Sequence, residues 1–209
     1  MNPTEEDGLP LKTQKGGIMD RKSWDKLVSW SGLIVSVVLV LVGIMAVYGG
    51  NFGQQNVTDR LAPEKVQFPP YDAMTPEEQQ EVGDFAGQQV TDGVQAEAFA
   101  RYIAGHLVFI NDGKTYSETS AAARVEGIPA DQAAELSAKA DTLFKGETLR
   151  AILLNAYGWW TVSQIAIYAG YVMIVAGIAM LVLAVLGFRH MKKMDVGVTP
   201  KEEKVLVNA

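Results

Sequence analysis

Two long stretches of the chain are apolar and contain no charged residue. Residues 27–48 form the first run, and residues 151–188 form the second, so the runs are 22 and 38 residues long. A hydrocarbon core about 30 Å thick is crossed by about 20 apolar residues in a helix, so each run predicts a transmembrane helix. We place the spans at residues 27–48 and 157–188. The predicted fold class is therefore an all-α membrane protein with two transmembrane helices.

Residues 49–156 separate the spans and carry helical patterns. Thr75 precedes Pro76, and Glu78 stands three positions after Thr75, which is the pattern of a helix N-terminus with a capping box. Further helices are expected over residues 93–110 and 117–126 and from about residue 129, whereas residues 51–70 favour an extended connector. No run alternates with period two, so the inserted segment is predicted to be a helical domain.

The second uncharged run is too long for a membrane span alone. As a helix its 38 residues would extend about 57 Å, nearly twice the thickness of the hydrocarbon core. Residues 151–157 must then lie outside the membrane, where the apolar group of Leu149, Ile152, Leu153 and Ala156 needs cover. We therefore expect the second span to continue outward and pack against the outer helices, with Gly158 as a possible kink.

Small residues recur every seven positions in both spans, and this period is typical of a left-handed helix crossing. The pattern favours a tight antiparallel hairpin, although contacts between copies of the chain would use the same residues. The candidate helix-packing residues are Ser29, Ser36, Gly43 and Gly50 in the first span, and Ala156, Ser163, Gly170, Gly177 and Ala184 in the second.

Charge at the ends of the spans predicts the orientation. Residues 1–26 and 189–209 carry five Lys or Arg each, whereas residues 49–156 carry eight basic and sixteen acidic residues. Basic residues near span ends favour the cytoplasm. Both tails, residues 1–26 and 189–209, are therefore expected to be cytoplasmic, with residues 49–156 outside.

Composition excludes several classes of function. The net charge of −6 argues against a nucleic-acid partner, and the absence of Cys excludes disulfides and thiolate metal sites. The expected partners are the lipid bilayer and other membrane proteins or copies of this chain.

The sequence contains two histidines, which the predicted topology separates. His106 lies in the outer segment and His190 on the cytoplasmic side, so one chain cannot ligate a haem with both. His106 stands on the apolar face of its helix, which favours a hydrogen-bonded core histidine over a metal or proton role. The carboxylates near residue 80 favour a solvated acidic face over a cation site. No nucleophile or phosphate-binding motif is present, so no catalytic, cofactor-binding or metal residue is assigned, and a non-enzyme is expected.

The second span carries three larger polar side chains and no charge. Gln164, Tyr168 and Tyr171 lie in its outer half. A structural polar contact, with the first span or with a partner, is favoured over a transport path, because a carrier usually needs more than two spans in each chain.

Several short segments resemble a family of uncharacterised two-pass membrane proteins from high-GC Gram-positive bacteria. The similarity covers roughly residues 55–190 and is carried by residues 85–89, 105–107, 113–117, 146–150 and 153–157. It implies the two-pass topology and a bacterial cell membrane location. Some members carry an automatic label of aromatic ring-opening dioxygenase. This chain does not support that label, because an iron site of that type needs two histidines and a carboxylate in one pocket, and the outer segment offers only His106.

Three hypotheses for function follow. The first is a non-enzymatic accessory or scaffold subunit of a cell-envelope assembly, which uses its outer helical domain for protein–protein contact. The second is a homo-oligomeric pore lined by the second span, with Ser163, Gln164 and Tyr171 facing water. The third is a membrane-anchored enzyme or sensor centred on His106, which would need an open pocket and a nearby carboxylate.

Overall fold

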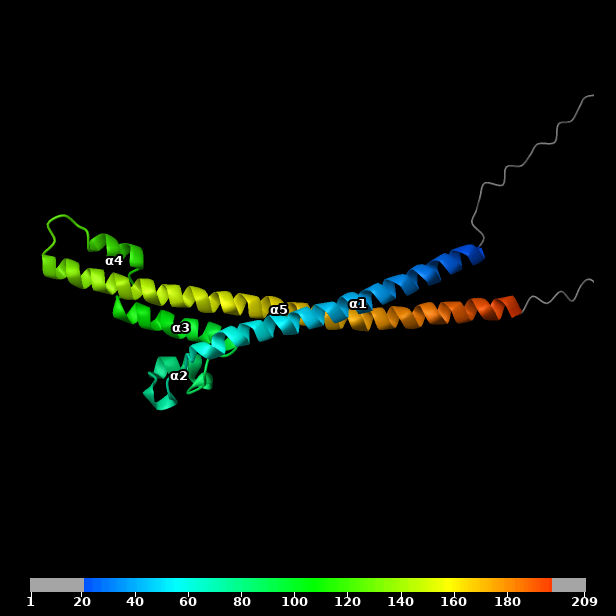
Figure 1. Ribbon diagram of the computed structural model, residues 1–209, viewed down its shortest axis with the longest axis horizontal. Coiled ribbons are helices and arrows are strands. Elements are labelled where there is room, and N and C mark those ends of the chain that lie inside the picture. The colour runs from blue at the N-terminus through cyan, green and yellow to red at the C-terminus, as the bar shows by residue number, and fades with distance from the viewer. Residues whose placement is uncertain (1–20, 197–209) are drawn as a thin grey trace, which may run out of the picture. The chain divides into compact units, whose positions relative to one another are not determined.

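The computed structural model describes residues 21–196, which are mainly helical (Figure 1). Three turns of 3-10 helix, Ala62–Glu64, Tyr71–Ala73 and Gly83–Phe85, lie between the longer helices. Over the described range no β-strand occurs, and residues Gln67 and Gln89 form one isolated antiparallel bridge. The prediction of an all-helical chain is confirmed. The α-helices are α1 (Arg21–Leu61), α2 (Pro76–Val82), α3 (Gly93–Ile110), α4 (Tyr116–Ala122) and α5 (Ala130–Val196).

Helices α1 and α5 are each long and apolar enough to cross a membrane. In each, only 11% of the most apolar window of 18 residues is buried inside the chain. The core helix of a soluble protein would be mostly buried over the same length. The exposed apolar side chains run along α1 from Leu27 to Phe52 and along α5 from Trp159 to Leu186.

Helix α1 extends further than the sequence suggested. Residues 51–70 were expected to form an extended connector, but α1 continues to Leu61, so this expectation is wrong for residues 51–61. The physical reason is tertiary: Val57 and Leu61 are buried in the core of the helical domain. Their burial favours helix in a segment whose local sequence is rich in polar and turn-forming residues.

The chain divides into two compact units, to both of which α1 and α5 contribute. Among the described residues, the first unit comprises residues 21–40 of α1 and 175–196 of α5. In this unit Trp30 and Phe188 meet edge to face, with ring centroids 5.9 Å apart. The second unit, residues 41–174, contains the remaining helices and a hydrophobic core.

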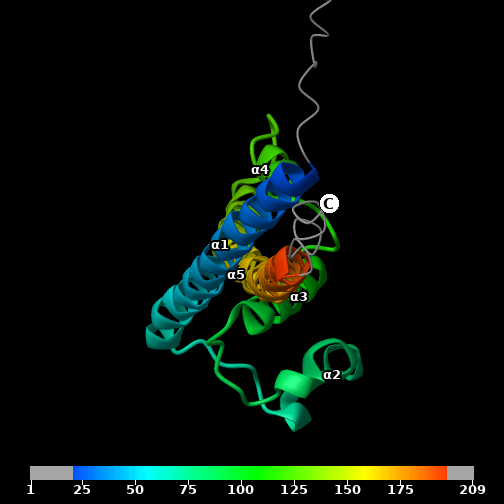
Figure 2. The ribbon, with the colours of Figure 1, turned by 90° about the vertical axis from the view of Figure 1, so that its right-hand side faces the viewer.

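The core of the second unit joins α1, α3 and α5 to the segment that connects α1 with α3. Phe68 is 1% exposed, stacks on Phe85 and meets Phe99 edge to face, with centroids 5.4 and 5.0 Å away. Leu153 of α5 is buried in the same cluster. Within this unit α3 lies between α2 and the early part of α5 (Figure 2). Leu153 is thus covered as expected and Ala156 is half-buried, but Leu149 and Ile152 are 40% and 59% exposed, so the expected cover is wrong for these two residues.

Local sequence accounts for most helix ends in this unit. Thr75 caps α2 with Glu78 in the expected capping box, and Asp92 caps α3 in the same manner with Gln95. The helix expected over residues 117–126 is shorter, because α4 spans Tyr116–Ala122. Helix α5 begins at Ala130 and continues unbroken through Gly158, so the outward extension of the second long helix is present without an interruption there.

Candidate functional site

The small residues of the second unit lie where α1 approaches α5. A Cβ placed on Gly43 would lie 2.7 Å from the backbone oxygen of Gly170, and one on Gly50 would lie 2.6 Å from the backbone oxygen of Ser163. Ser163 is buried, and its hydroxyl donates to the backbone oxygen of Trp159 at 2.8 Å. Ala156 is half-buried against the core. The small residues of α1 and α5 thus meet within one chain, and Ser163 packs between the two helices.

The first unit repeats this arrangement. A Cβ on Gly177 would lie 3.0 Å from the backbone oxygen of Ser36, and Ser36 is fully buried. Ser29 and Ala184 are also buried. These residues bring the backbones of two helices together, which is the role that small residues have between helices in lipid.

His106 is not a core histidine, so the expectation of burial is wrong. Its side chain is 48% exposed, and its Nδ1 lies 3.1 Å from Oε1 of Glu78, which is 19% exposed. The ring packs on Tyr102 with centroids 4.5 Å apart. The reason for the difference is that α3 turns this face toward α2, whose carboxylates are polar neighbours. Leu107, one position further, faces α5 and is buried.

The carboxylates of α2 are in part paired with α3. Oε1 of Glu81 lies 3.5 Å from Nη1 of Arg101. Nε of Arg101 also lies 2.9 Å from Oε1 of Glu97 on the same helix. Burial raises the pKa of Tyr102, and the negative charge of Glu78 raises it further. Among residues 21–196, no three His, Asp or Glu side chains are arranged to hold a metal ion. The contacts of α2 therefore serve to fix it on α3.

The larger polar residues expected in the second span lie mainly at the surface of α5. Gln164 is half-buried, whereas Tyr168 and Tyr171 are exposed by 66% and 54%. Among the described residues, neither tyrosine belongs to the hydrophobic core. A contact of either with a partner stays a prediction.

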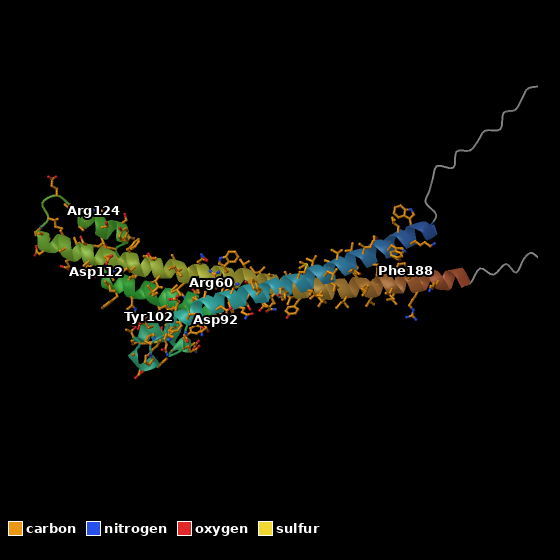
Figure 3. The ribbon with its side chains drawn as sticks, viewed as in Figure 1. Arg60, Asp92, Tyr102, Asp112, Arg124 and Phe188 are labelled. Atoms are coloured by element: carbon orange, nitrogen blue, oxygen red, sulfur yellow. The ribbon has the colours of Figure 1, made fainter. Side chains whose placement is uncertain are left out.

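Apolar side chains are exposed at the end of α3, in and after α4, and on α5, in the part of the second unit that Asp112 and Arg124 mark in Figure 3. Phe109 at the end of α3 is 87% exposed. The sequence analysis missed this surface, although Val108 and Phe109 stand outside the apolar face expected for that helix, which was a usable signal. We call this set the distal surface; it consists of Val108, Phe109, Ile110, Tyr116, Val125 and Phe144.

A pocket of about 290 Å³ opens between α4 and the first turns of α5. Two aromatic residues, two serines and two charged residues line it, together with two alanines. Its position depends on the turn after α3, where Asn111 is buried and donates to the hydroxyl of Thr119. Gly113 in this turn has a φ of +75°, which favours glycine. The lining side chains are Tyr116, Ser120, Arg124, Ser137, Asp141 and Phe144.

Comparisons of the chain with family models, with curated proteins and with solved structures give no match. The function is therefore argued from the residues and their geometry.

Proposed function

We propose that this chain is a two-span membrane protein and an accessory or scaffold subunit of a cell-envelope assembly. Its helical domain would contact partner proteins outside the membrane. In this proposal residues 27–48 and 157–188 cross the bilayer, both tails lie in the cytoplasm, and residues 49–156 lie outside. The bacterial membrane location and the resemblance to the two-pass family belong to the same proposal.

Exposed apolar side chains support membrane insertion. Burial of apolar surface is favourable by about 25 cal/mol per Å², so the exposed rows on α1 and α5 would be costly in water. Aromatic residues stand near the proposed boundaries, with Trp24 and Trp30 toward the cytoplasm and Tyr48 and Trp159 toward the outside. Such residues favour the membrane–water interface.

The distal surface is the observation that carries the docking role. Helix α5 rises about 1.5 Å per residue, so Phe144 of the distal surface stands about 20 Å along the helix from the proposed end of the span at residue 157. Lipid cannot cover apolar side chains that far from the bilayer. Exposed apolar side chains that adjoin are typical of a protein–protein contact, and the rings of Tyr116 and Phe144 adjoin here with centroids 5.8 Å apart.

Site-specific photo-crosslinking tests the docking role. A photoreactive amino acid at Phe109, introduced in cells that make the full chain, should give a discrete adduct with another protein. Val94 is the matched control, because it lies on the same helix and is exposed but is outside the distal surface. Adducts of equal yield at both positions, or none at Phe109, would refute docking through this surface.

The topology has a separate test. The chain contains no Cys, so single cysteines can be introduced at Gln80 and Lys192, which are both exposed. A membrane-impermeant maleimide should label Gln80→Cys on intact cells and label Lys192→Cys only after lysis. The reverse pattern would invert the orientation, and labelling of both on intact cells would refute the two-span arrangement.

A homo-oligomer is the second candidate, favoured by the exposure of Tyr168 and Tyr171. Two tyrosine hydroxyl groups on a lipid-facing surface lack polar partners unless another copy supplies them. Crosslinking at Tyr171 that yields only a dimer or larger oligomer of this chain would favour this candidate over a scaffold for other proteins. Burial of Ser163 argues against Ser163 as a pore-lining residue.

A further inference from the structure

The pocket between α4 and α5 combines an apolar wall with unpaired polar groups. Tyr116 and Phe144 form the wall, with ring centroids 5.8 Å apart and ring planes inclined by 50°. Ala140 at the base is buried. A flat or branched apolar group fits beside such rings, and a volume of about 290 Å³ suits a small ligand.

Arg124 gives the pocket a positive charge that the described part of the chain does not neutralise. Within residues 21–196, no Asp or Glu forms an ion pair with Arg124, whereas Arg101 and Arg150 are each paired with a carboxylate. Asp141 also lines the pocket, but its carboxylate lies 2.6 Å from the ammonium group of Lys145. The Lys145 ammonium group offsets the carboxylate of Asp141, so the guanidinium of Arg124 is the charged group of the pocket left to pair with a ligand.

Ser120 provides a hydrogen-bonding group in the same pocket. The residue is buried, and over the described range its hydroxyl takes part in no side-chain hydrogen bond. The neighbouring Thr119 is held by Asn111 and by the backbone oxygen of Thr115, so the backbone that carries Ser120 is fixed. The hydroxyl oxygen stays accessible from the pocket, so it can hydrogen-bond with a ligand oxygen.

We propose that this pocket binds a carboxylate joined to an aromatic or branched aliphatic group. The guanidinium of Arg124 pairs with the carboxylate, because its planar array of N–H donors matches two carboxylate oxygens. The Ser120 hydroxyl donates to the same group, and the apolar part lies against Tyr116 and Phe144. The pocket shares Tyr116 and Phe144 with the distal surface, but this assignment is tested with a small ligand and without a partner protein, so its failure is distinguishable from failure of the docking role.

Ligand-observed NMR on the full chain in lipid nanodiscs tests the assignment. The probe is 3-phenylpropionate, its neutral counterpart is 3-phenylpropanamide, and empty nanodiscs correct for partition into lipid. We expect saturable binding of the acid with a Kd of about 1 mM, which corresponds to about −4 kcal/mol. The amide should bind at least about tenfold more weakly, because it lacks the charge that pairs with Arg124.

Matched variants assign the binding to named residues. Arg124→Gln and Phe144→Ala should each weaken binding of the acid about tenfold or more. Lys114→Gln, an exposed cation outside the pocket, should leave it unchanged. Both pocket side chains are exposed, so the helical circular dichroism signal should stay the same in all three variants.

Several results would overturn the assignment. They are equal binding of acid and amide, no saturable binding of the acid to the natural chain, equal loss of binding in Lys114→Gln, or tighter binding of inorganic phosphate than of the acid. A short peptide that ends in phenylalanine distinguishes the source of the carboxylate. Binding of this peptide as tight as that of the free acid indicates a polypeptide C-terminus, and exclusion of the peptide indicates a small molecule.

Discussion

Replacement of Gly170 by Ala tests the packing of α1 on α5 most directly. A Cβ at this position would lie 2.7 Å from the backbone oxygen of Gly43 and 2.9 Å from the backbone nitrogen of Val47. Ordinary contacts of a Cβ are 3.4–4 Å. Both contacted atoms belong to the backbone of α1, so the helix itself must move to relieve the overlap.

The expected loss follows from two opposing effects. Overpacking in a well-packed interior costs about 1–3 kcal/mol. Ala in place of Gly within a helix gains about 0.5–1 kcal/mol. Gly158 lies on the same helix with nothing within 4 Å of a Cβ, so Gly158→Ala experiences only the gain. The two variants should therefore differ by about 1–3 kcal/mol, with Gly170→Ala the less stable.

Thermal unfolding in a mild detergent, followed by tryptophan fluorescence, measures this difference. For a chain of this length 1 kcal/mol shifts the midpoint by about 2–4 °C, so Gly170→Ala should unfold about 2–12 °C below Gly158→Ala. Gly170→Leu and Gly177→Leu should lower the midpoint further. Equal midpoints for the two alanine variants would refute the close approach of the helices.

Three further predictions concern the helical domain. Phe68→Ala should destabilise the domain by about 3–5 kcal/mol in denaturant unfolding, because Phe68 is buried in the core. Phe109→Ala, at an exposed position, should change the stability by less than about 0.5 kcal/mol. Equal effects of the two variants would contradict the placement of Phe68 in the core. Hydrogen bonds from Thr115 lower the pKa of Glu118, so its stabilisation is present above the unfolded pKa and is lost as the pH falls through the folded pKa; Glu118→Gln should flatten that acid dependence of the unfolding midpoint. Because the pKa of Tyr102 is raised, the stabilisation by its neutral phenol is complete below the ordinary tyrosine pKa of about 10 and is lost as the pH rises through the folded value. Tyr102→Phe should remove a phenol transition above pH 10 from the absorbance titration at 295 nm. An unchanged titration would contradict the partly buried environment of Tyr102.

Features that depend on residues close together in the sequence were predicted from the sequence alone. The two uncharged runs predicted two long apolar helices, because the length and composition of a run can be read without knowing the fold. The cap of Thr75 on α2 and the bounds of α3 were also predicted, since a capping box acts within a few residues. The length of the second uncharged run indicated correctly that its helix continues past the proposed membrane boundary.

Features that depend on contacts between distant segments emerged only from the folded chain. The local sequence of residues 51–61 favours a connector, and burial of Val57 and Leu61 against residues far along the chain makes it helical instead. His106 was expected in a core, but the direction in which α2 packs places Glu78 beside it at the surface. The pocket requires residues from α4 and α5 at once. Short-range periodicity specifies which residues share a helix face. The free energy of packing between distant segments decides which segment contacts that face.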